Sequence, residues 1–161
     1  MMRKVQNRAE TRGLLRAHGI APTHQRVELA YCLFFSQAHW SADQLQAVVN
    51  SQREQTSKAT VYNTLKLLLS KGLIREVIVN PKKVFYDPNT DGHHHFYDIQ
   101  SGELVDIDSS GITVEGLPPL PQGVIADGVD IIVRIRRPSA AGERLPDTHS
   151  QRYRSKRDSL I

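Results

Sequence analysis

Cysteine is almost absent from this chain of 161 residues, which contains only Cys32. A single thiol cannot form a disulfide within the chain, and it cannot build a cysteine-only metal site. Cys32 lies in the apolar run AYCLFF, where a small buried side chain is a better interpretation than a reactive thiol. Any bound metal is therefore expected to rest on other ligands.

Long apolar runs are also missing. No stretch approaches the roughly 18 apolar residues of a membrane span. The first residues, MMRKVQNRAETRG, carry charge but no apolar segment after it, so a secretory signal is not expected. We predict a cytoplasmic protein with no membrane partner.

Basic residues are absent from one long segment. Residues 89–133 contain no Lys or Arg and 8 Asp and Glu, a net charge of -8. Residues 1–88 contain 13 Lys and Arg against 6 Asp and Glu, a net charge of +7. A basic region suits a polyanion such as nucleic acid, whereas an acidic region attracts cations. The distribution therefore predicts nucleic acid at one end of the chain and a metal at the other.

Four helices are expected in the first half. The first covers about residues 7–18, and the second opens near residues 21–23 with an apolar face that reaches Phe34. The third begins at Ser41, which forms a capping box with Gln44. The fourth starts after Thr56 or Ser57 and runs to about residue 71.

Short β-like runs follow the helices. REVIVN and KVFYD surround an Asn-Pro-Lys-Lys turn, which predicts a basic hairpin. Helices followed by a basic hairpin are the order of a winged helix. HHHFYDIQSGELVDI predicts two strands around Ser101–Gly102, and VDIIVRIR predicts one more. We predict an α+β fold with a winged-helix DNA-binding domain over residues 1–87, a small α/β dimerisation and sensing domain over 88–138, and a basic, disordered tail over 139–161.

The fourth helix has the composition of a major-groove reader. Its N-terminal part carries Lys58, Thr60, Tyr62 and Asn63, which can hold phosphates, contact a thymine methyl group or pair with an adenine edge. The alternative is that these residues only solvate a surface helix. The basic turn, with Lys82 and Lys83, favours DNA because a wing tip lies over the sugar-phosphate backbone.

Three consecutive histidines stand in the acidic segment. On a strand His93 and His95 face one side and His94 the other. Asp87 and Asp106 can add carboxylates, which gives a mixed N/O site suited to Fe(II), Mn(II) or Zn(II). The alternative is a set of solvated histidines.

The segments PTHQR, beginning at Pro22, and ATVYNTL, beginning at Ala59, closely resemble the ferric uptake regulator (Fur) family over about residues 7–137. The resemblance implies that Tyr62 and its neighbours contact DNA, with Arg26 as a supporting phosphate contact. It also implies that His39 joins Asp87, His93, His95 and Asp106 as a metal ligand. Iron(II) or manganese(II) is the implied ion.

The chain departs from the family at one known site. Members with structural zinc carry CxxC after the histidine motif, but this chain has Asp98 and Ser101 there, so no structural zinc site is expected. The HHHFYD segment, the Pro-rich stretch after residue 112 and the VDIIVRIRR run are similar to the iron response regulator (Irr) branch. That resemblance implies haem as a second ligand, at His93, His94 and His95.

Together these features and the resemblance predict a dimeric, metal- or haem-responsive transcription regulator that binds inverted-repeat double-stranded DNA and controls iron or haem genes. We expect a repressor, although the sequence does not distinguish repression from activation. Two alternatives are a ligand-independent DNA-binding regulator and a metal-dependent hydrolase. The chain has no HExxH, no nucleophile elbow and no Gly-rich phosphate loop, so we do not expect an enzyme.

Overall fold

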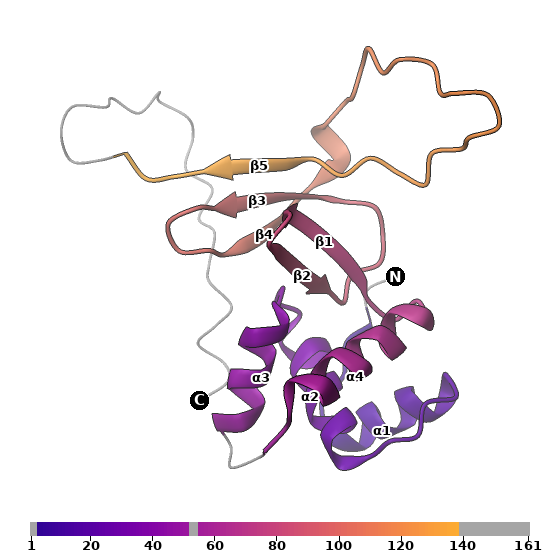
Figure 1. Cartoon of the computed structure of the whole chain (residues 1–161), viewed down its shortest axis with the longest axis vertical. Helices are drawn as coiled ribbons and strands as arrows, with labels where there is room; N and C mark the ends of the chain where they lie inside the picture. Colours follow the sequence, from indigo (N-terminus) through magenta and orange to yellow (C-terminus); the bar gives the residue numbers. More distant parts are fainter. Residues whose placement is uncertain (1–2, 52–54, 139–161) are drawn as a thin grey trace. The chain divides into compact units, whose positions relative to one another are not determined.

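The computed structural model describes residues 3–51 and 55–138 of the chain (Figure 1). The chain divides into two compact units between Asp91 and Gly92, within the loop that follows Asp87. The predicted disordered tail over 139–161 lies outside the described residues.

The first unit opens with two capped helices. α1 (Arg8–Ala17) starts at Asn7, whose side chain accepts the Glu10 N–H. α2 (His24–Ser36) starts at Thr23, whose side chain accepts the Arg26 N–H. The sequence predicts that α2 starts within residues 21–23. In the structure Thr23 is the N-cap, and Pro22 therefore precedes the helix.

The next two helices complete the helical part. α3 (Ala42–Ser51) begins with the predicted capping box: the Ser41 N–H donates to Gln44 Oε1 at 3.0 Å, and the Gln44 N–H donates to Ser41 Oγ at 3.3 Å. α4 (Lys58–Ser70) has Ser57 as its N-cap. It ends just before Gly72, whose positive φ of 62° suits glycine at a helix C-terminus.

The predicted hairpin follows. β1 (Arg75–Asn80) pairs antiparallel with β2 (Lys83–Asp87), and the Lys82 N–H donates to Asn80 Oδ1 at 2.9 Å in the turn. The apolar side chains of β1 alternate, because Val77 and Val79 are buried whereas Ile78 is exposed.

The first unit has a continuous apolar core. α2 contributes Leu29, Leu33 and Phe34, and α4 contributes Leu65 and Leu68, all of them completely or almost completely buried. Packing of α2 and α4 through these side chains fixes which face of α4 remains outside. The core therefore positions the outer face of α4.

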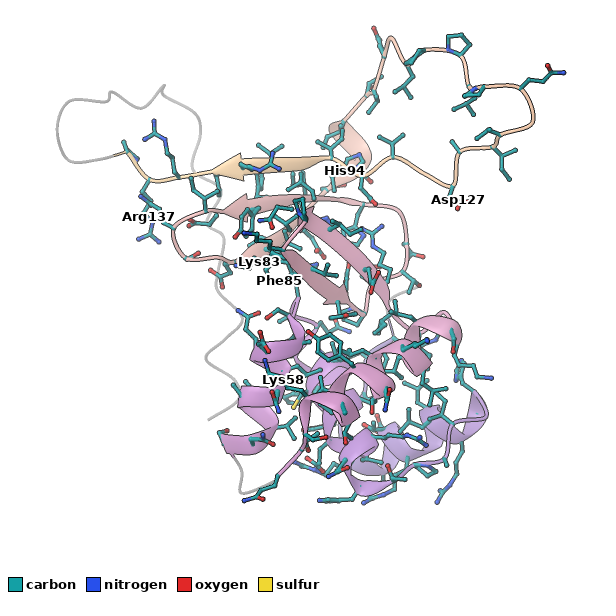
Figure 2. All side chains as sticks on the ribbon, in the orientation of Figure 1. Lys58, Lys83, Phe85, His94, Asp127 and Arg137 are labelled. Carbon is teal, nitrogen blue, oxygen red and sulfur yellow. The ribbon has the colours of Figure 1, made fainter. Side chains whose placement is uncertain are left out.

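The second unit contains a three-stranded sheet in the order β4-β3-β5. β3 (His94–Asp98) pairs antiparallel with β4 (Leu104–Ile107) and parallel with β5 (Ile132–Ile135). A single 3-10 turn, η1 (Ser109–Gly111), follows β4, and a long extended segment that includes Asp127 leads to β5 (Figures 1 and 2). The mixed helices and small sheets confirm the predicted α+β class.

None of the helices in residues 3–51 and 55–138 has the length and apolar character needed to cross a membrane.

Candidate metal centre and DNA-binding surface

Two of the predicted metal ligands lie together in the first unit. Trp40 and Tyr86 form an isolated antiparallel bridge, in which each backbone N–H donates to the other carbonyl, at 3.2 and 2.8 Å. His39 precedes Trp40 and Asp87 follows Tyr86, so the bridge places these two side chains opposite each other. His39 Nε2 lies 3.5 Å from Asp87 Oδ2, and both side chains are buried.

Asp87 has further partners in the first unit. Arg75 is its cross-strand neighbour in the hairpin, and Arg75 Nε donates to Asp87 Oδ2 at 3.3 Å. The Asn89 N–H donates to Asp87 Oδ1 at 2.8 Å. These contacts fix the orientation of the buried carboxylate. A carboxylate offers about four lone-pair sites, so Asp87 can retain these bonds and still accept a hydrogen bond from His39 or coordinate a cation.

Three predicted ligands lie together in the second unit. His95 on β3 is directly opposite Asp106 on β4, and His93 is on the same side two residues earlier. Asp106 Oδ1 is 3.3 Å from His93 Nε2 and 3.7 Å from His95 Nε2. His95 is fully buried, whereas the Asp106 side chain is 38% exposed. The β3–β4 register thus brings two imidazoles to one carboxylate.

The donor set fits a transition-metal ion. Two imidazoles and one carboxylate are the ligands of the facial triad that binds Fe(II) with open positions, and they also suit Mn(II) and Zn(II). Ligand atoms at about 2.1 Å from an ion, at angles between about 90° and 110°, lie about 3.0–3.5 Å apart. The 3.3 Å separation of His93 from Asp106 falls in that range, and the 3.7 Å separation of His95 lies slightly outside it.

His94 does not join this group. Its Nδ1 accepts the Ile131 N–H at 3.3 Å, while the neighbouring His95 N–H donates to the Ile131 carbonyl at 3.0 Å. His94 therefore serves the junction between β3, where Figure 2 labels it, and the start of β5. The alternation expected of a strand, with His94 opposite to His93 and His95, is present in the structure.

A hydrogen-bonded turn occupies the positions where zinc-binding relatives would carry CxxC. Asp98 Oδ1 accepts the N–H groups of Gln100 and Ser101, at 2.8 and 3.2 Å. These bonds favour the ionised carboxylate and lower the pKa of Asp98. The turn between β3 and β4 is thus closed by a carboxylate without any thiol.

The predicted DNA-contacting residues of α4 divide by exposure. Lys58, Tyr62 and Asn63 are exposed, with Tyr62 at 51%, whereas Thr60 is partly buried and bonds the N-cap Ser57. The opposite face, with Val61, is buried. The exposed residues follow the helical period, so they form one outward face of the helix.

Lys58 already has an acidic neighbour. Its Nζ lies 2.9 Å from Asp43 Oδ1, and this contact raises the pKa of Lys58. Both side chains are about 70% exposed, and such surface pairs contribute little free energy. A phosphate group can therefore replace Asp43 at little cost. Figure 2 labels Lys58 at the start of α4.

The remaining predicted DNA contacts lie on α2 and the hairpin. Arg26 is in the first turn of α2, and its Nη1 donates to the Ala21 carbonyl at 3.1 Å. Lys82 is exposed at the hairpin turn, whereas the Lys83 ammonium lies 5.3 Å from the centroid of the Phe85 ring (Figure 2). Lys83 therefore takes part in a cation–π contact, and Lys82 is the more accessible of the two lysines.

Sequence reasoning missed two residues near these sites. Arg75 faces Asp87, and counting outward from the hairpin turn could have found this pair. Lys66 is exposed one turn beyond Tyr62, and the period of the helix could have placed it on the same face.

Sequence comparison places these features in a known family. Residues 17–116, well over half of the chain, match the profile of the ferric uptake regulator family. The peroxide-responsive repressor PerR of Staphylococcus aureus (strain Mu50 / ATCC 700699) is 32% identical over 92 residues, which is 57% of this chain and 62% of that protein. The chain thus spans less than two thirds of the length of the curated relatives that it matches.

Solved structures support the fold. The chain is similar to the Vibrio cholerae ferric uptake regulator, with a TM-score of 0.61 and 17% identity over 78% of this chain and 98% of that one. The Helicobacter pylori ferric uptake regulator, described as having three functional metal binding sites, gives a TM-score of 0.59 at 16% identity over 83% of this chain and 95% of that one. By its sequence match and its fold, the chain belongs to the ferric uptake regulator family.

Proposed function

We propose that the chain is a metal-responsive transcription regulator that binds double-stranded DNA as a homodimer in the cytoplasm. The observation that carries the proposal is the pair of imidazoles, His93 and His95, held at the Asp106 carboxylate in a segment without basic residues. An N/O donor set of this kind is typical of a site for Fe(II) or Mn(II). Because the chain belongs to the ferric uptake regulator family, we interpret this site as that of a transcription regulator.

The regulatory site draws on both units in this proposal. His39 and Asp87 belong to the first unit, and the second unit adds His93, His95 and Asp106. An ion bound by both sets of ligands would favour one arrangement of the units over others. The ion's higher affinity for that arrangement would couple metal binding to DNA binding. A bound Fe(II) or Mn(II) would supply a fixed positive charge among the carboxylates. Arg75, which shares Asp87, helps to hold the site in its metal-free form.

DNA binding is assigned to the outer face of α4 and to the hairpin. In this assignment Tyr62 and Asn63 contact base edges, while Lys58, Thr60 and Arg26 hold phosphates. Lys82 and Lys83 lie over the backbone as the wing. Two copies of α4 in a dimer would read the two halves of an inverted repeat.

The dimer contact is assigned to the second unit. Within the described residues β5 pairs on one side only, and Val133 and Ile135 on it are each 40% exposed. The segment before β5 is exposed and rich in apolar side chains, among them Leu120 and Ile125. Burial of these groups against a second copy would remove an exposed apolar surface of the kind that marks interaction sites.

We further propose that the protein responds to iron and haem and controls genes of iron or haem homeostasis. In this proposal His93 and His95 serve as axial imidazoles, so haem would compete with the metal for them and lower DNA affinity. His94 would have to release the Ile131 N–H before its Nδ1 could bind iron. We therefore assign haem, as in the iron response regulator branch, to His93 and His95 before His94.

The test is operator binding by full-length protein in four states: metal-free, with Mn(II), with Fe(II) under anaerobic conditions, and with haem. The operator is a duplex that the Mn(II)-loaded protein selects from random DNA. We expect metal to tighten binding and haem to weaken it. His93→Ala should abolish both responses, and His18→Ala, at the C-cap of α1, should keep them. Responses retained in His93→Ala would contradict the site, and a wild type without any response would indicate a ligand-independent regulator.

A second candidate function is peroxide-responsive repression, which the similarity to PerR favours. The only thiol of the chain, Cys32, is buried, so a peroxide response would have to act at the metal ligands. Treatment of the Fe(II)-loaded protein with hydrogen peroxide would then release it from the operator, and the Mn(II)-loaded protein would stay bound. Equal binding of both forms after peroxide would remove this candidate.

A further inference from the structure

The turn that carries His39 is closed by a small hydrogen-bonded cluster centred on Ser36. Ser36 Oγ donates to the Cys32 carbonyl at 2.6 Å. The same oxygen accepts the indole Nε1–H of Trp40 at 3.0 Å and the Ala38 N–H at 3.3 Å. One hydroxyl therefore ties the last turn of α2 to both neighbours of His39.

The backbone on both sides of His39 is fixed as well. Gln37 ends α2 in the left-handed conformation, with φ 52°, and its N–H donates to the Leu33 carbonyl at 3.2 Å. Trp40 is bridged to Tyr86 by two backbone hydrogen bonds. The capping box of α3 begins at the next residue, Ser41.

Trp40 and Cys32 belong to the apolar core, whereas Ser36 does not, and apolar packing alone does not require a hydroxyl at position 36. A serine at the end of a helix commonly bonds only its own preceding carbonyl, as Ser70 does at the end of α4 with Leu67. Ser36 differs because its oxygen also accepts two hydrogen bonds from the turn that follows. Its position is explained by the orientation of that turn, and the residue that the turn presents to Asp87 is His39.

We infer that Ser36 and Trp40 form a clasp that positions His39 as a metal ligand. The inference rests on the proposed function, since it assumes that His39 binds the ion. Ser36 acts through His39 and is a positioning residue. Partners that orient metal ligands are worth about 10- to 100-fold in metal affinity. A fixed His39 would also pass the effect of ligation directly to the ends of α2 and α3.

The chain provides its own reporter for the test. Trp40 is its only tryptophan and is 7% exposed, so intrinsic tryptophan emission reports the clasp alone. In metal-free protein, Ser36→Ala removes the acceptor of the buried indole N–H, and we expect emission shifted to shorter wavelength because the excited indole loses a polar partner. Ser36→Thr keeps the hydroxyl and should retain the wild-type emission. Ser70→Ala, which removes a helix-terminal hydroxyl away from His39, is the matched control.

Metal affinity is then measured by calorimetry with Mn(II). We expect binding about tenfold weaker in Ser36→Ala, and within about twofold of wild type in Ser36→Thr and Ser70→Ala. Should Ser36→Ala lose its helical circular dichroism, Trp40→Phe removes the indole donor instead and should show the same weakening. Wild-type emission and wild-type affinity in Ser36→Ala would overturn the inference. If the wild-type protein binds no Mn(II) while the Ser36→Ala variant still shows the emission shift, the proposed function is overturned. The clasp would then be a purely structural feature, and its role at a metal would be overturned as well.

Discussion

The two units of this chain differ in charge and in how they treat apolar side chains. Residues 1–88 carry a net charge of +7, and the buried apolar cluster of the protein lies in this part. Residues 89–133 carry -8, and many of their large apolar side chains remain exposed, Ile125 at 85%. The first unit thus buries most of its large apolar side chains in its own core. In the second unit, exposed apolar side chains and acidic groups can bind other molecules.

The largest effect is expected from a cavity in the first unit. Leu65 on α4 is 1% exposed in the apolar cluster. Leu65→Ala should lower the free energy of unfolding by about 3 kcal/mol, because it loses apolar burial and leaves a cavity. Urea denaturation followed by circular dichroism measures it.

Ile99→Ala is the matched change in the second unit, where the side chain is 50% exposed. It should alter the free energy of unfolding by less than about 0.5 kcal/mol. Equal losses for the two variants would show that the contrast in packing is wrong.

The next effect concerns the outer face of α4. The double variant Tyr62→Ala, Asn63→Ala should weaken operator binding by about 2–4 kcal/mol, since it removes one bidentate base contact and one apolar contact. Its unfolding should match the wild type, because both side chains are exposed. Fluorescence anisotropy with the selected duplex measures the affinity. Wild-type affinity in this variant would move the DNA-reading surface away from α4.

A smaller effect is expected at the hairpin. Lys82→Ala, Lys83→Ala should weaken binding to all DNA sequences alike and reduce the slope of log affinity against log salt by about 2 per protomer, or about 4 for the dimer, at roughly 0.9 for each lost phosphate contact. Of the two single variants, Lys82→Ala should account for more of the change, since Lys83 also contacts Phe85. An unchanged slope would exclude the hairpin from the DNA contact.

The smallest functional effect is expected at the thiol. Burial raises the pKa of Cys32 to about 11 from the ordinary value of 9.0. At pH 8 the thiolate would be about one in a thousand molecules instead of about one in ten, so alkylation by iodoacetamide should be about 100-fold slower than in urea-unfolded protein. Cys32→Ala should leave metal and DNA binding unchanged. Rapid alkylation of the native protein would show that the Cys32 thiol is accessible and reactive, contrary to this prediction.

Much of this architecture follows from local sequence patterns. The Ser41–Gln44 capping box, the apolar period of α4 and the hairpin turn at residues 80–83 are local signals, and each predicted its element. The opposition of His95 and Asp106 was also predictable in outline, because the turn at Ser101–Gly102 sets the register of β3 and β4. Local signals therefore predicted the fold class and three of the five candidate ligands as a group.

The position of His39 could not be derived from local patterns. His39 meets Asp87 only because Trp40 and Tyr86 pair across 46 residues of sequence, and this bridge is an isolated tertiary contact. The resemblance to a family indicated the residue, but not the hydrogen bonds of Ser36 that hold it. Long-range contacts of this kind depend on the packing of α2, α3 and β2 together, which no single segment encodes.

We propose that metal binding and DNA binding are coupled in one chain. The most direct test is the Mn(II) affinity of the full-length protein, measured with and without a saturating amount of its selected duplex. Linkage requires that, if metal tightens DNA binding, DNA tightens metal binding by the same factor, and couplings of this kind are about 5- to 150-fold. We predict an increase in that range for the wild type. Identical Mn(II) affinities with and without DNA would contradict the account.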